Sequence, residues 1–133
     1  LMAVMDRGRI LQIGPPQQVY ERPATATVAR FIGRGTLIPA QIADGRARIL
    51  GQDVAVDGTG TGDRTVFVRP ESIAVGATGW PARIGSVHYR GGYWEAAAQG
   101  ECLPEPVMLD LKQPARVGET VRLSFTGGWI LPD

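Results

Sequence analysis

The alternation of apolar and polar positions changes character near residue 36. Beyond that point, apolar side chains recur at every second position in short runs, and glycine-rich turns such as Asp44–Gly45 separate the runs. A period of two predicts half-buried β-strands, and an Asp-Gly pair predicts a hairpin turn between two of them. About eight short strands at this spacing are typical of a small barrel or sandwich. The pattern therefore predicts a mainly β fold for this part of the chain.

A hairpin and a short helix are expected before residue 36. Apolar runs at residues 2–6 and 9–13 flank a polar turn that contains Gly8, which predicts a β-hairpin. Two prolines then end the second strand, because proline has no N–H to donate to a ladder. Pro16 can open a helix of little more than one turn, and Pro23 ends it, because the residue before a proline is disfavoured in the α region.

A second short helix is predicted between Thr25 and Gly33. Thr25 is a favourable N-cap, and Gly33 can end the helix with a positive φ. Val28, Phe31 and Ile32 fall at positions i, i+3 and i+4, so they share one face. We expect these three side chains to pack the helix onto the barrel.

Composition limits the possible partners. The 133 residues include 14 basic and 13 acidic side chains, which give a net charge of +1. Without a basic surface, we expect no nucleic-acid partner, and the aromatic group Tyr89, Tyr93 and Trp94 is better explained by core or interface packing than by stacking on bases. The single Cys102 cannot form an internal disulfide and is expected to be a small buried hydrophobic residue.

No residue set for catalysis, cofactor binding or metal binding stands out. The only histidine, His88, lies within a predicted strand, where a structural role is the ordinary reading, and acidic residues occur singly. The Walker A pattern Gly-x-x-x-x-Gly-Lys-Ser/Thr and the Leu-Ser-Gly-Gly-Gln signature do not occur in the sequence. We therefore expect no ATP binding or hydrolysis by this chain alone.

Arg69, Pro70 and Glu71 follow an apolar strand and have two readings. Proline can simply end the ladder while the two charges face water. Alternatively, the three residues form a charged contact with a neighbouring domain or subunit. The sequence leaves both readings open.

Seven short segments stand out when they are taken in order: Met2–Ile10, Gln12–Pro16, Tyr20–Pro23, Phe31–Gly33, Leu37–Ala40, Val68–Glu71 and Tyr89–Gly91. Together they resemble the end of the ATPase domain and the following TOBE (transport-associated OB) domain of importer-type ABC transporter ATP-binding subunits. The resemblance implies an OB-like small β-barrel (TOBE/MOP-like) preceded by a β-hairpin and two short helices. It also implies a division into residues 1–35, the remnant of a nucleotide-binding domain with its linker helices, and residues 36–133, the regulatory domain.

The resemblance and the start of the chain within a strand at Leu1 lead us to expect a fragment of a longer protein. The parent would be the ATP-hydrolysing subunit of a binding-protein-dependent importer, and its Walker A loop, signature and switch histidine would precede Leu1. His88 does not match that switch histidine. ATP and Mg would be bound by the parent, and no cofactor by this fragment.

For the fragment itself, the resemblance implies a non-catalytic regulatory and dimerisation domain. Its partners would be a second copy of itself and, in the parent, transmembrane permease subunits, at a cytoplasmic location on the inner face of the membrane. The importer could be of the polyamine, ferric iron, sugar or anion type. The alternative is a small-oxyanion-binding module of the molybdate-binding type. Because unpaired strand edges recruit partners, we also expect self-association through the hairpin at residues 2–13, the barrel, or both.

Overall fold

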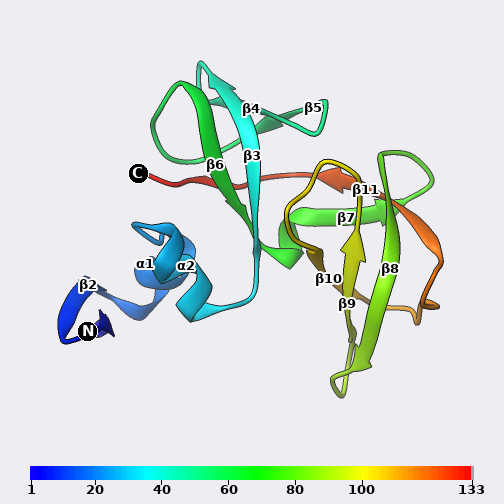
Figure 1. Cartoon of the computed structure of the whole chain (residues 1–133), viewed down its shortest axis with the longest axis horizontal. Coiled ribbons are helices and arrows are strands. Elements are labelled where there is room, and N and C mark those ends of the chain that lie inside the picture. Colours follow the sequence, from blue (N-terminus) through cyan, green and yellow to red (C-terminus); the bar gives the residue numbers. More distant parts are fainter. Residues whose placement is uncertain (133) are drawn as a thin grey trace.

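The computed structural model describes residues 1–132 and shows a mainly β protein (Figure 1). Two five-stranded sheets form a barrel-like body, and a small unit of one hairpin and two helices lies at its end. The predicted mainly β, OB-like class is confirmed.

The N-terminal unit, residues 1–32, contains the predicted hairpin and both helices. Its elements are β1 (Met2–Asp6), β2 (Arg9–Gly14), α1 (Pro16–Glu21) and α2 (Ala26–Ile32). The predicted cap is also present, because the Thr25 hydroxyl accepts a hydrogen bond from the Val28 N–H at 3.2 Å. A shift of register opposite Val4 and Met5 leaves both Ile10 and Ile13 on the outer face of the hairpin.

The first sheet has the strand order β12-β6-β3-β4-β5. Its strands are β3 (Thr36–Ala43), β4 (Arg46–Ile49), β5 (Gln52–Ala55), β6 (Gly62–Val68) and β12 (Trp129–Ile130). All of its pairings are antiparallel. Alternate residues of β4, and of β3 from Ile38 onwards, are buried, as the period of two predicted.

The second sheet has the order β10-β9-β8-β11-β7, again antiparallel. Its strands are β7 (Ile73–Gly76), β8 (Trp80–Tyr89), β9 (Trp94–Gln99), β10 (Val107–Leu111) and β11 (Thr120–Phe125), and the 3-10 turn η1 (Pro70–Ser72) leads into β7. Side chains from both sheets meet in one core, in which the fully buried residues include Ile38, Ile49, Val66, Ile84, Leu109 and Leu123.

Side chains join the two sheets where backbone pairing stops. Strand β8 pairs with β11 only as far as Leu123. Beyond it, the Gln52 amide on β5 donates to the Leu123 carbonyl at 2.8 Å and accepts from the Phe125 N–H at 2.9 Å. At the other seam, the Met108 N–H donates to the Thr36 hydroxyl at 2.9 Å. The Gln52 amide thus continues the ladder of β11 and connects the first sheet to the second.

We predict that Gln52→Ala lowers the free energy of unfolding by about 1–3 kcal/mol, because it leaves a partly buried N–H and C=O without partners. Urea unfolding followed by circular dichroism measures the change. Gln41→Ala is the matched control: its exposed side chain on β3 has no hydrogen bond among the described residues, and the change should stay within about 0.5 kcal/mol. Equal losses in both variants would show that Gln52 does not join the sheets.

Candidate functional site

The joint between the N-terminal unit and the barrel is built around Arg69, which follows β6. Arg69 is only 8% exposed. Its Nη1 donates to the Arg34 carbonyl at 2.7 Å, and its Nη2 donates to the Tyr20 carbonyl at the end of α1. The guanidinium carbon lies 3.5 Å from the centroid of the Tyr20 ring and 4.6 Å from that of Phe67. One barrel side chain therefore contacts α1 and the segment after α2 at the same time.

The charge of Arg69 is held in an unusual way. Among residues 1–132, no carboxylate lies within ion-pair distance of its guanidinium, and its Nε has no hydrogen-bond partner. Burial lowers the pKa of Arg69, and the neighbouring Tyr20 and Glu71 oppose that shift. An arginine stays protonated even so. Two carbonyl oxygens and two aromatic faces therefore offset the cost of removing this cation from water.

Arg34 fastens the linker between α2 and β3 to the second sheet. Its guanidinium makes a two-point contact with the Asp110 carboxylate on β10, with one bond of 3.1 Å. Its Nε lies 3.1 Å from a Glu95 carboxylate oxygen, without the angle of a hydrogen bond. The Tyr93 ring lies beneath the guanidinium, 5.4 Å away. The hydrogen bond to Asp110 is the main reason that the pKa of Arg34 is raised, so the guanidinium stays charged.

Trp129 on β12 provides a third attachment. Its indole Nε1 donates to the Pro23 carbonyl between the two helices at 2.8 Å. The Arg22 guanidinium lies over the same ring, 5.5 Å from its centroid. Because β12 pairs with β6 next to Phe67, the Trp129 and Arg69 attachments belong to the same part of the first sheet.

The helix residues expected to pack on the barrel do so differently. Val28 is fully buried, but against Val4 and Val19 within the N-terminal unit, and Ile32 packs partly on the same cluster. Phe31 is 60% exposed. The prediction for this face was wrong, because Val28 and Ile32 pack within the N-terminal unit and Phe31 is exposed. The buried residue of α2 that meets the barrel is Ala29, next to Leu37, Phe67 and Leu131.

The structure separates the members of the Arg-Pro-Glu segment. Arg69 and Pro70 are buried and Glu71 is exposed, so the reading that both charges face water was wrong for Arg69. Arg69 contacts Tyr20 and Arg34, which both lie before the domain boundary predicted at residue 35. That boundary, and a contact of these residues with another subunit, stay predictions.

The remaining candidates do not form a site. Cys102 is exposed in a turn with φ of 69°, so the prediction that it is buried was wrong. His88 is exposed on β8, opposite Glu95 of β9. Residues 1–132 contain no group of three metal-ligating side chains. Within the same range, no helix has the length and hydropathy to cross a bilayer.

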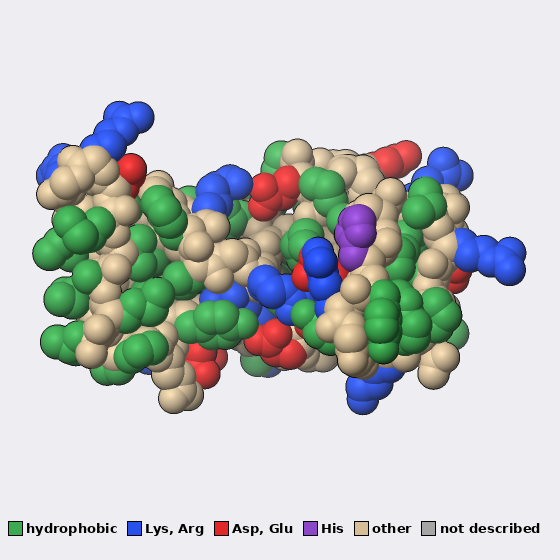
Figure 2. All heavy atoms as spheres, turned by 90° about the horizontal axis from the view of Figure 1, so that it is seen from below, with side chains coloured by type: hydrophobic (Ala, Val, Ile, Leu, Met, Phe, Trp, Pro, Cys, Tyr) green, Lys and Arg blue, Asp and Glu red, His purple; other side chains and the backbone are tan. Residues whose placement is uncertain are grey.

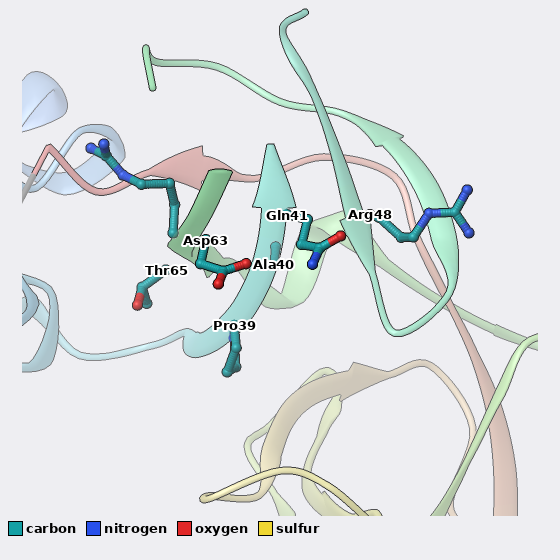
Figure 3. A pocket seen from close by; sticks show the side chains of 7 residues that line it. Pro39, Ala40, Gln41, Arg48, Asp63 and Thr65 are labelled. Carbon is teal, nitrogen blue, oxygen red and sulfur yellow. The ribbon is translucent and has the colours of Figure 1, made fainter. Parts of the chain in front are cut away.

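A hollow of about 610 Å³ lies on the outer face of the first sheet (Figure 3). Gln41, Arg48 and Asp63 lie in a row across three paired strands there. In Figure 3 the Arg48 side chain points away from the other two, so these polar groups do not converge on one ligand position. The joint is therefore the better candidate.

The N-terminal unit also presents an apolar surface. Figure 2 shows hydrophobic side chains gathered at the end of the molecule that this unit forms. Met5 is 53% exposed, and Ile10 and Ile13 are each 58% exposed on the outer face of the hairpin. We call Met5, Ile10 and Ile13 the apolar end face. Clustered exposure of this kind marks a surface for packing against another protein surface.

Comparison with known proteins gives a consistent result. A family model described as the TOBE domain matches residues 66–131, which run from β6 to just past β12. The sulfate/thiosulfate import ATP-binding protein CysA of Bradyrhizobium diazoefficiens is 45% identical over 91 residues, which is 66% of this chain and 26% of the relative. The same-named protein of Xanthomonas campestris pv. campestris is 30% identical over 136 residues, covering 98% of this chain and 40% of that protein.

A third relative has a different printed name. The Fe(3+) ions import ATP-binding protein FbpC 3 of Rhodococcus jostii is 40% identical over 79 residues, covering 59% of this chain and 23% of the relative. The chain thus spans between 23% and 40% of the length of the relatives described here.

A double-mutant cycle tests the Arg34 attachment. Arg34→Gln and Asp110→Asn should show a coupling free energy of about 1 kcal/mol, because the pair is partly buried and joined at two points. The coupling should decrease in 1 M salt. The more exposed pair of Arg46 and Asp53, 2.9 Å apart, is the control, with an expected coupling below about 0.5 kcal/mol. Equal coupling in the two pairs would contradict a special role for Arg34.

Proposed function

The chain belongs to the TOBE domain family through residues 66–131, and from that premise we propose that it is the non-catalytic regulatory part of the ATP-binding subunit of an ABC importer. ATP hydrolysis, with bound ATP and Mg, would belong to the longer parent, which would work with transmembrane permease subunits on the cytoplasmic side of the membrane. The names of the relatives support this proposal, since each is an import ATP-binding protein.

The observation that carries the proposal is the apolar end face on a unit tied to the barrel. Ile10 and Ile13 lie on a two-stranded hairpin that pairs with no further strand among the described residues. An isolated two-stranded hairpin is only marginally stable in water. We propose that this face packs against the ATPase domain of the parent. The three attachments at Arg69, Arg34 and Trp129 would then set how the regulatory barrel sits on that domain.

The names of the relatives favour two of the possible cargoes of the importer. Proteins named for sulfate/thiosulfate import and for Fe(3+) import match the chain at 45% and 40% identity. We therefore propose one of these two cargoes, ahead of polyamines or sugars. A second copy of the chain remains the proposed partner for dimerisation.

Calorimetry on the purified chain tests the non-catalytic role. Titration with ATP and Mg should give no binding heat, because the sequence has no Walker A loop to hold the phosphates. Molybdate, tungstate, sulfate and phosphate should also give none. Micromolar binding of ATP would contradict the proposal, whereas micromolar binding of an oxyanion would favour the small-oxyanion module.

Sedimentation equilibrium tests the apolar end face. The chain should self-associate at high micromolar concentration, and the double change Ile10→Lys with Ile13→Lys should raise the dissociation constant at least about tenfold, because it places charges on the face that would be buried. Val117→Lys is the matched control, since Val117 is 68% exposed in a loop of the barrel. If the unchanged chain is monomeric at high micromolar concentration, the apolar end face does not mediate self-association. Equal effects of the double change and the control on the dissociation constant would lead to the same conclusion.

A further inference from the structure

We infer that the N-terminal unit can separate from the barrel as one body, by movement of the linker at residues 33–35. We call the joint a latch, because the contacts of Arg69 determine how large the separated population is. All the contacts of the joint lie within this chain, so the latch is independent of the proposed function.

The N-terminal unit and the barrel have separate cores. Val4, Val19 and Val28 form the centre of the first, and none of them belongs to the barrel core. The Gln12 side chain closes the unit on itself, donating to the Arg22 carbonyl at 3.0 Å and accepting from the Ala24 N–H at 2.8 Å. In the described chain, the hairpin pairs with neither five-stranded sheet. Separation at the joint would therefore leave both cores packed.

The contact between the two bodies combines a small apolar cluster, in which Ala29 meets Leu37, Phe67 and Leu131 of the barrel, with several polar attachments. Ala29 is the fully buried residue that α2 adds to the cluster at the joint, and alanine buries little apolar surface. The other attachments are hydrogen bonds and ion pairs from Arg69, Trp129 and Arg34, together with the exposed pair of Arg30 on α2 and Glu105, 3.2 Å apart. Water can replace each of these when the surfaces separate, so their net stabilisation is modest.

Arg69 dominates this balance because its two acceptors lie outside the barrel. One is the Tyr20 carbonyl at the end of α1, and the other is the Arg34 carbonyl in the linker. With the unit docked, the guanidinium is buried and these carbonyls are satisfied. With the unit released, water would hydrate the guanidinium and the carbonyls. Removing the guanidinium therefore penalises only the docked state, which leaves two partly buried carbonyls without this donor.

The linker contains Gly33 and Gly35, and backbone rotation is least restricted at glycine. Gly33 has φ of 96°, in the region that favours glycine, and a Cβ placed there would meet no atom within 4 Å. Gly35 lies against the Phe67 ring, where a Cβ would overlap it. Hinges of this kind take up backbone rotation in a few residues between two rigid bodies.

Pulsed electron paramagnetic resonance on the full chain tests the latch. One spin label is placed on the native, exposed Cys102 of the barrel and the other on Arg7→Cys at the exposed hairpin tip. The docked state should give one narrow distance distribution. Arg69→Met, which keeps an apolar side chain of similar length, should increase the separated population at least about tenfold. Arg48→Met is the control, since Arg48 is exposed and points away from its neighbours (Figure 3).

Trp129→Phe is the second test variant, because it removes the indole donor to Pro23 and keeps a ring in place. It should also broaden the distribution, while circular dichroism shows an intact β fold. If Arg69→Met fails to fold, Trp129→Phe decides the question alone. An unchanged narrow distance distribution in every folded test variant would overturn the latch. Unfolding of the barrel together with the N-terminal unit in both variants would also overturn it.

Discussion

The structure depends on one buried cation. Arg69 places a guanidinium between the rings of Tyr20 and Phe67 and satisfies it mainly with main-chain carbonyls. A carboxylate partner on the barrel would hold the charge in place whether or not the helices were docked. Carbonyls from α1 and the linker make the burial of the charge conditional on docking. The N-terminal unit and the barrel are thereby coupled through the hydration of a single side chain.

Side chains also satisfy backbone groups at the two seams, where the sheets of the barrel meet. At Leu123 and Phe125, where the pairing of β11 with β8 ends, the Gln52 amide supplies the missing donor and acceptor. Thr36 accepts from the free edge of β10. In each case a side chain satisfies backbone groups that strand pairing leaves open, as buried polar groups require. The seams join two sheets over one shared core, whereas the joint connects two separate cores, so we expect the joint to open first.

Local features of the fold were predictable from sequence, and most long-range features were not. The period of two, the Thr25 cap and the proline breaks depend on neighbouring residues, and each predicted the element that the structure contains. The stripe that includes Val28 correctly indicated a buried side of α2 but could not show whether the hairpin or the barrel covers it. Arg69 precedes a proline at the end of a strand, a setting equally typical of a solvated exit. Arg34 has its partner Asp110 far along the chain, and no local pattern marks that pair.

The most direct measurement of the central claim is the hydrogen-exchange rate of the three tryptophan indole protons, followed by nuclear magnetic resonance. Trp129 donates its indole N–H across the joint to Pro23, whereas no such bond is present for Trp80 or Trp94 among the described residues. The account predicts that the Trp129 proton exchanges at least about tenfold more slowly than the other two, and that Arg69→Met removes this protection while the barrel amides remain protected. Exchange of the Trp129 proton that is as fast as that of the other two, or that is unaffected by loss of the Arg69 guanidinium, would contradict it.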